Sequence, residues 1–301
     1  MLNPRLIKKR VSSIKNIGKI TKALEMVSAS KVQRAQTKAL NAKPYARAIF
    51  DLIRNLSRDL EATEIPLMRK PYEIKNDLYI LISTNRGLAG SLNTNLFRRL
   101  NEHLKTKDTQ HSFITIGKKG RFIASLNGKL EADFSESYDM TSSVSAVIKI
   151  ITDEFIQGIY DEVYIVYTEF VTALTQEPSI KKILPISREE LEKEEESEVF
   201  ELTGKRQVRE TSYVKTSNFS YEPDSLTVLS NLLPYYLEIQ LTESLYEAQA
   251  SEHSARMIAM KNASDNASEL SSILSLEYNK ARQSMITTEI SDITVAQATL
   301  A

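Results

Sequence analysis

Apolar residues recur every three or four positions near both ends of the chain, and this spacing predicts a long amphipathic helix at each end. Near the amino end they are Ile7, Val11, Ile14, Ile17, Ile20, Leu24 and Val27. Near the carboxyl end they are Met257, Met260, Ala263, Ala267, Leu270, Leu274, Tyr278, Ala281 and Met285. The second set takes eight steps over 28 residues, and a mean step of 3.5 residues is typical of a left-handed coiled coil. The simplest assembly packs the two helices antiparallel.

Helix-breaking residues limit the lengths of these helices. The first helix is expected to run from about Pro4 to the high fifties, with a bend near Pro44. All eight glycines lie at or before Gly204 and all eight prolines at or before Pro234, so residues 235–301 contain neither helix breaker. At about 1.5 Å per residue, one helix over that stretch would extend on the order of 100 Å.

Short apolar runs alternate with amphipathic stretches in the middle of the chain. The predicted strands are residues 78–83, 112–117 and 163–167, and the predicted helices between them are residues 92–100 and 144–155. Alternation of strand and helix predicts an α/β domain of Rossmann-like type with a mainly parallel sheet. Residues 170–186, interrupted by Glu177-Pro178, are expected to add an edge hairpin.

These patterns divide the chain into four parts and predict a mixed α and β fold. We expect a coiled-coil helix over residues 1–58, a central α/β domain over 72–186, an acidic polar linker over 187–221 and a second coiled-coil helix over 222–301. The linker begins with a glutamate-rich stretch that lacks the apolar residues needed for a packed core. The expected fold is therefore an antiparallel coiled coil of the two terminal helices joined to a central α/β domain.

The formal net charge of the chain is zero, but the charge is unevenly distributed. Residues 1–48 contain twelve Lys or Arg against one acid, Glu25, a local charge of +11. Residues 235–301 contain four basic and nine acidic residues, a local charge of −5. The two ends could attract each other, or the basic end could bind an anionic partner. A nucleic-acid-binding coiled-coil arm is therefore an alternative function, although aromatic residues for base stacking are lacking before Tyr45.

Composition argues against a self-contained enzyme. Cysteine is absent, which excludes disulfides, thiol nucleophiles and thiolate metal sites and is compatible with a cytosolic protein. The three histidines, His103, His111 and His253, are isolated in the sequence. The sequence therefore yields no candidate catalytic, cofactor-binding or metal-ligating residue. It also contains no apolar run of the roughly 18 residues that a membrane span requires, and no signal peptide is predicted.

The turn Ser83-Thr-Asn-Arg-Gly-Leu-Ala-Gly90 follows a predicted strand, where glycines can expose backbone N–H groups to a phosphate. Its spacing matches neither G-x-G-x-x-G nor the G-x-x-x-x-G-K-[ST] phosphate loop. A nucleotide-dependent enzyme built on the α/β domain is therefore the weaker of two alternatives.

Four sequence blocks, in order, resemble the gamma subunits of F-type ATP synthases; they are residues 14–31, 83–96, 252–266 and 278–289. The resemblance covers essentially the whole chain. It implies a non-catalytic central-stalk rotor, present once per complex, that transmits torque between an ion-driven membrane c-ring and a catalytic hexamer of alpha and beta subunits. Proton or sodium flow would then be coupled to ATP synthesis. The resemblance also implies contact with the epsilon subunit, a role in regulating ATPase activity and a peripheral position on the cytoplasmic face of a bacterial cell membrane, with no nucleic acid or cofactor bound.

The resemblance also assigns roles to particular residues. Contacts with the beta-subunit loops are expected at Lys19, Lys22, Leu24, Arg256, Arg282, Gln283, Thr287 and Glu289. Arg86, Gly87 and Gly90 belong to the signature of the family's central domain. The acidic linker is longer than the family's typical connection, which leads to the hypothesis that it adjusts regulation by epsilon.

Overall fold

A computed structural model describes residues 4–58, 65–69, 71–136, 140–187 and 221–300. The elements are α1 (Pro4–Arg58), η2 (Pro66–Met68), β1 (Asn76–Ile82), α2 (Leu92–Leu104), β2 (Gln110–Ile116), α3 (Arg121–Asn127), β3 (Lys129–Asp133), η3 (Met140–Ser143), α4 (Val144–Ile156), β4 (Glu162–Phe170), β5 (Gln176–Leu184) and α6 (Ser225–Leu300). Contacts divide the chain into unit 1, residues 1–30 with 256–301, and unit 2, residues 31–255. Both α1 and α6 contribute residues to each unit.

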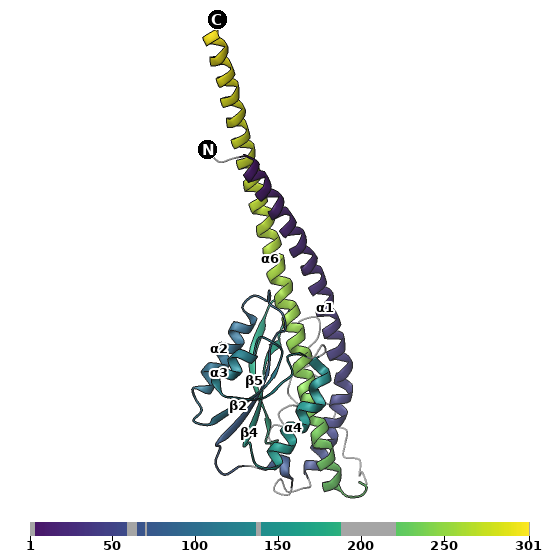
Figure 1. Cartoon of the computed structure of the whole chain (residues 1–301). Helices are drawn as coiled ribbons and strands as arrows, with labels where there is room; N and C mark the ends of the chain where they lie inside the picture. Colours follow the sequence, from purple (N-terminus) through teal and green to yellow (C-terminus); the bar gives the residue numbers. More distant parts are fainter. Residues whose placement is uncertain (1–3, 59–64, 70, 137–139, 188–220, 301) are drawn as a thin grey trace. The chain divides into compact units, whose positions relative to one another are not determined.

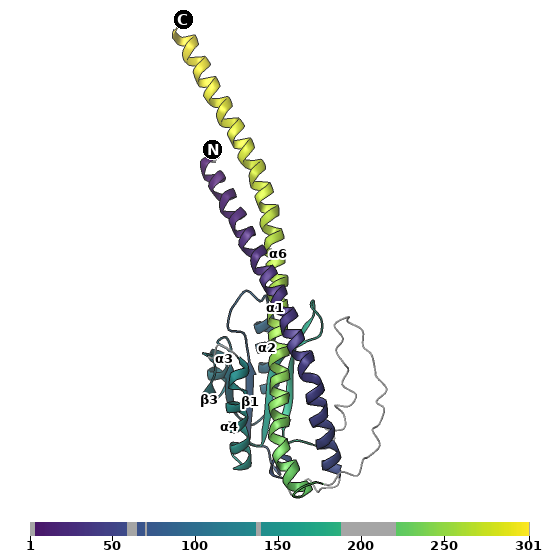
Figure 2. The same cartoon turned by 90° about the vertical axis from the view of Figure 1, so that its right-hand side faces the viewer.

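Unit 1 is an antiparallel pair of helices, as the sequence predicted (Figure 2). Gly18 of α1 lies against α6, where the Ser264 hydroxyl donates a hydrogen bond of 3.4 Å to the Gly18 carbonyl. A methyl group added at Gly18 would lie 3.4 Å from the Cβ atom of Ala267, which is an ordinary contact distance. Small residues at this level therefore allow the two backbones to approach closely.

The residues that line this helix pair differ in part from the predicted apolar set. Ile17, Ile20 and Val27 are more than half exposed, and Leu270 is 46% exposed. The prediction holds at four α1 positions, where Ile7 is buried and Val11, Ile14 and Leu24 are partly buried. The other inward positions of α1 carry small or polar residues: Gly18, Thr21, Glu25 and Ser28. The prediction was wrong at Ile17, Ile20, Val27 and Leu270 because it counted apolar side chains, whereas close backbone approach favours small residues.

Unit 2 contains a five-stranded sheet of order β3-β2-β1-β4-β5. The three central strands and β3 run parallel, while β4 and β5 form an antiparallel edge pair. The three predicted strands and the edge hairpin are confirmed. The sequence analysis missed β3, because its five residues, Lys-Leu-Glu-Ala-Asp, lack an apolar run.

Alternating side chains of the strands contribute to two apolar cores. Tyr79 and Leu81 of β1 face α2 and α3, whereas Leu78, Ile80 and Ile82 face α4 and the unit 2 portions of α1 and α6. Figure 1 shows these helices on opposite faces of the sheet. Since both faces are covered, the central strands are almost continuously apolar.

Both long helices continue through an internal proline, Pro44 in α1 and Pro234 in α6. At the start of α6, Asp224 caps the helix by accepting the Thr227 backbone N–H at 2.8 Å and the Thr227 hydroxyl at 2.8 Å. Most of the predicted linker, residues 188–220, lies outside the described residues. Within the described part of the chain, no helix combines the length and hydropathy needed to cross a bilayer.

Candidate functional site

The eight predicted beta-contact residues all belong to unit 1. Lys19, Lys22 and Leu24 lie on α1; the other five lie on α6 and are Arg256, Arg282, Gln283, Thr287 and Glu289. Leu24 and Arg256 are half-buried, whereas the other six are exposed. Most of these residues are therefore displayed on the surface of the helix pair rather than used to hold it together.

The predicted contact residues fall at different levels along the helix pair rather than in one site. Lys19 and Lys22 lie near the level of Gly18 and Ala267, where the helices touch. At about 1.5 Å per residue, Arg282 is roughly 22 Å further along α6 from Ala267 and Glu289 roughly 33 Å. The structure thus separates an α1 group from an α6 group near the carboxyl end.

Local bonds restrict two of these side chains. The Lys22 ammonium contacts the Glu25 carboxylate at 2.9 Å in an exposed pair one turn apart, which partly offsets the positive charge there. The Thr287 hydroxyl donates to the Gln283 backbone carbonyl at 3.0 Å, leaving the hydroxyl oxygen as an acceptor.

Exposed apolar residues accompany these polar candidates, and the sequence analysis did not assign them to a contact with another subunit. On α1 they are Ile17, Ile20, Met26 and Val27; on α6 they are Leu276, Met285, Ile286, Ile290, Ile293 and Val295. Each of them is more than 40% exposed. Clustered apolar exposure of this kind is typical of a surface that a partner covers. The sequence could have indicated this surface. Apolar residues lie on more than one face of these helices, and only one face of a helix can pack against a single partner helix.

The signature residues Arg86, Gly87 and Gly90 lie in the loop that follows β1 in unit 2. Thr84 organises this loop: its hydroxyl donates to the Arg86 carbonyl at 2.9 Å and accepts from the Asn93 amide at 2.7 Å. Gly90 has φ 58° and Leu88 has φ 63°, so the loop uses left-handed backbone at two positions.

A second loop, residues 117–120, is bonded to the first. The Gly120 N–H donates to the Ser83 hydroxyl at 2.7 Å, and the Lys118 N–H donates to the Asn85 side chain at 3.1 Å. At Gly117, φ is 100° and an added Cβ would lie 2.0 Å from the Ser83 carbonyl oxygen. Glycine is required there because the two loops pack directly against each other.

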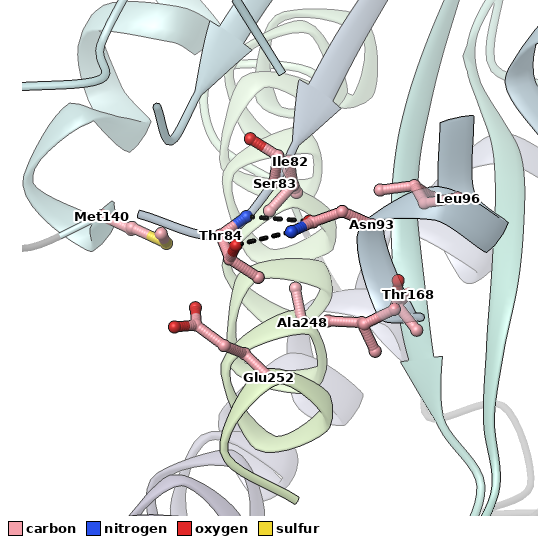
Figure 3. A pocket seen from close by; sticks show the side chains of 10 residues that line it. Ile82, Ser83, Thr84, Asn93, Leu96, Met140, Thr168, Ala248 and Glu252 are labelled. Carbon is pink, nitrogen blue, oxygen red and sulfur yellow. Dashed lines mark hydrogen bonds between the residues drawn. The ribbon is translucent and has the colours of Figure 1, made fainter. Parts of the chain in front are cut away.

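The carboxyl ends of β1 and β4 are where an open α/β sheet of this order usually binds a ligand. In unit 2 that crevice is occupied by the chain's own α6 (Figure 3). Ala248 and Glu252 face Thr84, Asn93 and Thr168, and the remaining cavity of about 10 Å³ is near the lower limit for one water molecule. The crevice therefore has no room for a nucleotide. Among the described residues, no group of three or more His, Asp or Glu is arranged to hold a metal ion.

A buried ionic cluster lies at the amino ends of the strands. Asp77 of β1 and Glu162 of β4 are directly paired across the two strands, and the Lys107 ammonium lies 3.6 Å and 2.6 Å from their carboxylates. Burial acts to raise the pKa of Glu162, but hydrogen bonds from Lys107 and Tyr164 outweigh it and lower that pKa. Burial is also the main cause of the lowered pKa of His103. This cluster fastens the loop that follows α2 to the sheet.

Comparison with known proteins identifies the family. The family model described as ATP synthase matches residues 3–300. The ATP synthase gamma chain of Roseiflexus castenholzii is 38% identical over 308 residues, which cover 100% of this chain and 99% of that protein. The ATP synthase gamma chain of Herpetosiphon aurantiacus is 39% identical over 313 residues, with 100% and 99% covered. This chain belongs to the ATP synthase gamma-chain family.

Chains in solved structures of mitochondrial ATP synthases share this fold. The rotor of the Euglena gracilis mitochondrial ATP synthase matches with a TM-score of 0.60 at 18% identity, covering 94% of this chain and 98% of that chain. The central stalk and c-ring structure of the Tetrahymena thermophila mitochondrial ATP synthase gives a TM-score of 0.57 at 22% identity, covering 81% and 99%. Membership of the gamma-chain family does not support the alternative of a nucleic-acid-binding arm.

Proposed function

We propose that this gamma chain is the central-stalk rotor subunit of a bacterial F-type ATP synthase and transmits torque between an ion-driven membrane c-ring and a catalytic alpha/beta hexamer. The observation that carries the proposal is the similarity to ATP synthase gamma chains over their full lengths. Proton or sodium flow would turn the chain, and the chain would force each catalytic site through states of different nucleotide affinity.

In this proposal the chain carries torque and contributes no catalytic group. The filled crevice in unit 2 supports the assignment of nucleotide chemistry to other subunits. The exposed apolar and polar side chains of unit 1 support a role in which a surrounding protein surface covers them. Since α1 and α6 each pass from one unit into the other as a continuous helix, a twist applied to one unit would be passed along backbone hydrogen bonds.

The proposed contacts with the beta-subunit loops are those expected from the sequence. Lys19, Lys22 and Leu24 would meet acidic and apolar loop residues, while Arg282 and Gln283 would bind loop carboxylates and carbonyls near the end of α6. The exposure of Lys19, Lys22, Arg282 and Gln283 supports this role. Arg256, Thr287 and Glu289 are proposed to complete these contacts.

The remaining proposed partners are the epsilon subunit and the c-ring, with one gamma chain per complex. The protein would lie at the cytoplasmic face of the bacterial cell membrane and be held there through its partners. The bacterial origin of the similar gamma chains supports this location.

The direct test is to tag the chain, purify it from gently solubilised native membranes and measure the subunit masses and Mg-ATPase activity of the material recovered. We expect three copies each of two nucleotide-binding subunits per gamma chain, together with ATPase activity. Recovery of the chain alone, or with RNA, would contradict the proposal.

The long acidic linker is proposed to adjust inhibition by epsilon. Deletion of residues 189–209 is expected to alter the ATPase rate of the complex or its inhibition by epsilon. An unchanged rate together with unchanged inhibition would rule out this role.

A further inference from the structure

A partly formed polar network lies in unit 2 where α6 packs on the edge of the sheet, and it includes Glu247. Glu247 Oε2 is buried and has no hydrogen-bond partner. The Tyr167 hydroxyl of β4 is a polar neighbour that lowers the pKa of Glu247, and Tyr167 is itself only 7% exposed. A buried carboxylate with an unsatisfied oxygen is costly when charged and less so when protonated.

The charges facing Glu247 make ionisation harder still. Glu243 lies one turn earlier on α6, and Glu169 approaches from β4; both repel a negative charge on Glu247. Glu169 is also paired directly with Glu177 of β5, so the sheet presents a negative edge. The cation acting on Glu247 is Lys181 of β5, whose ammonium also donates to the Gln240 side chain.

The same region joins α6 to a third element. Ala250 of α6 packs with Val32 and Ala35 of α1 and Phe170 of β4 in a small buried cluster. The neighbouring basic residues of α1, Lys31 and Arg34, are exposed. Glu247 therefore lies one helical turn from the contact at which α1, α6 and the sheet meet within unit 2.

We propose that Glu247 is a proton-sensitive latch: its protonated form holds α6 against β4, and its ionisation weakens that packing. The latch is a regulatory element in the fold itself, and it does not depend on any contact with other subunits.

The titration range agrees with this geometry. Burial, followed by the charges of Glu169 and Glu243, raises the pKa of Glu247 from 4.5 to about 7, against the opposing effects of Lys181 and Tyr167. Since the pKa is raised in the packed state, the stabilisation by protonated Glu247 is complete below pH 4.5 and is lost as the pH rises through 7. Linkage between these two pKa values gives about a tenfold increase in opening of the contact from pH 6 to pH 8.

The test is hydrogen–deuterium exchange with mass spectrometry on the full chain at pH 6 and pH 8, corrected for the intrinsic exchange rate. In the natural protein, the backbone amides of residues 240–250 are expected to open about tenfold more often at pH 8 than at pH 6. In Glu247→Gln, a neutral isostere, this pH dependence should disappear and protection at pH 8 should increase.

Glu269→Gln is the matched control, because it removes an exposed carboxylate from the same helix. It should retain the pH dependence of the natural protein. The proposal is overturned if the natural chain shows equal protection at both pH values, or if Glu247→Gln keeps the pH-dependent increase. Should Glu247→Gln not fold, the comparison of the natural chain at the two pH values still decides, since it must show the increase.

Discussion

Gly18 sets how closely the two helices of unit 1 approach each other. A Cβ atom added at Gly18 would lie 3.4 Å from the Ala267 Cβ, so one carbon atom fits there at an ordinary contact distance. The sequence analysis assigned no packing role to this glycine. Its packing role was not predictable, because it depends on which α6 residue lies opposite.

Replacement of Gly18 by valine is expected to lower the free energy of unfolding by about 1–3 kcal/mol, because the extra methyl groups force the backbones apart. Gly18→Ala is the control; it should fit and could stabilise the helix by up to about 1 kcal/mol. Urea unfolding followed by circular dichroism at 222 nm measures both. Equal stability of the two variants would show that the helices are not in close contact at this level.

Lys107 holds together two carboxylates that lie directly opposite each other on neighbouring strands. Removing the cation with Lys107→Met is expected to cost about 3–5 kcal/mol, since it leaves buried like charges without compensation. Lys105→Met, at an exposed neighbouring position, should change stability by less than about 0.5 kcal/mol. Denaturant unfolding at pH 7 compares the two variants, and equal losses would mean that the cluster contributes nothing specific.

The acid sensitivity of the same cluster gives a separate prediction. Because the pKa of Glu162 is lowered in the folded chain, its stabilising contribution is present above its ordinary value of 4.5 and is lost as the pH falls through the lower folded value. In Lys107→Met that loss should shrink, because the main hydrogen-bonding cation is gone. The free energy of unfolding of both proteins is measured from pH 3 to pH 6. If its dependence on pH is the same in Lys107→Met as in the natural chain, Lys107 does not control the pKa of Glu162.

At the scale of elements, strands and helices with strong periodicity were predictable and weakly apolar ones were not. The central strands are buried on both faces and therefore form unmistakable apolar runs, while β3 has intermediate burial and no run. Both terminal helices were predicted from apolar spacing, but three of the seven apolar α1 residues assigned to the contact with α6 are exposed. Ile17, Ile20 and Val27 point to solvent because the helix pair is closed by Gly18, Thr21 and Ser28.

The exposed end of α6 is where the sequence placed several contact residues, and it offers a functional prediction. In the assembled complex, Arg282→Ala with Gln283→Ala should reduce coupled ATPase activity without unfolding the α/β domain. A charge-assisted contact is worth about 1.5–3 kcal/mol, and the rest of the interface can mask part of a single loss. The double variant should therefore lose more ATPase activity than either single variant. Lys280→Ala, an exposed neighbour, is the control. Full activity of the double variant would remove these residues from the proposed interface.

At the scale of the whole molecule, the two units differ in how much apolar surface they bury. Buried apolar residues described in unit 1 are Ile7, Met260 and Ala267, whereas unit 2 holds two extensive cores on the faces of its sheet. Hydrophobic burial is the main source of stability in folded domains. Unit 1 should therefore be the less stable part of the isolated chain.

Hydrogen exchange of the isolated chain should show this difference directly. Amides in residues 4–30 and 256–295 are expected to exchange at least tenfold faster than those in β1, β2 and β4, because local opening of the helix pair exposes little apolar surface. Assembly with partner subunits should slow exchange in unit 1 most. Equal protection in both units of the isolated chain would show that they unfold as one cooperative body.

The α6 residues in the crevice at the ends of β1 and β4 act as a tethered ligand of the chain's own sheet. A covalently attached occupant competes at an effective concentration in the millimolar range or above, without the loss of translational freedom that a free molecule incurs on binding. Any small metabolite entering that crevice would first have to displace Ala248 and Glu252 and give up the helix packing around them. The position at which other open α/β sheets bind a ligand is here a packing contact between the sheet and α6.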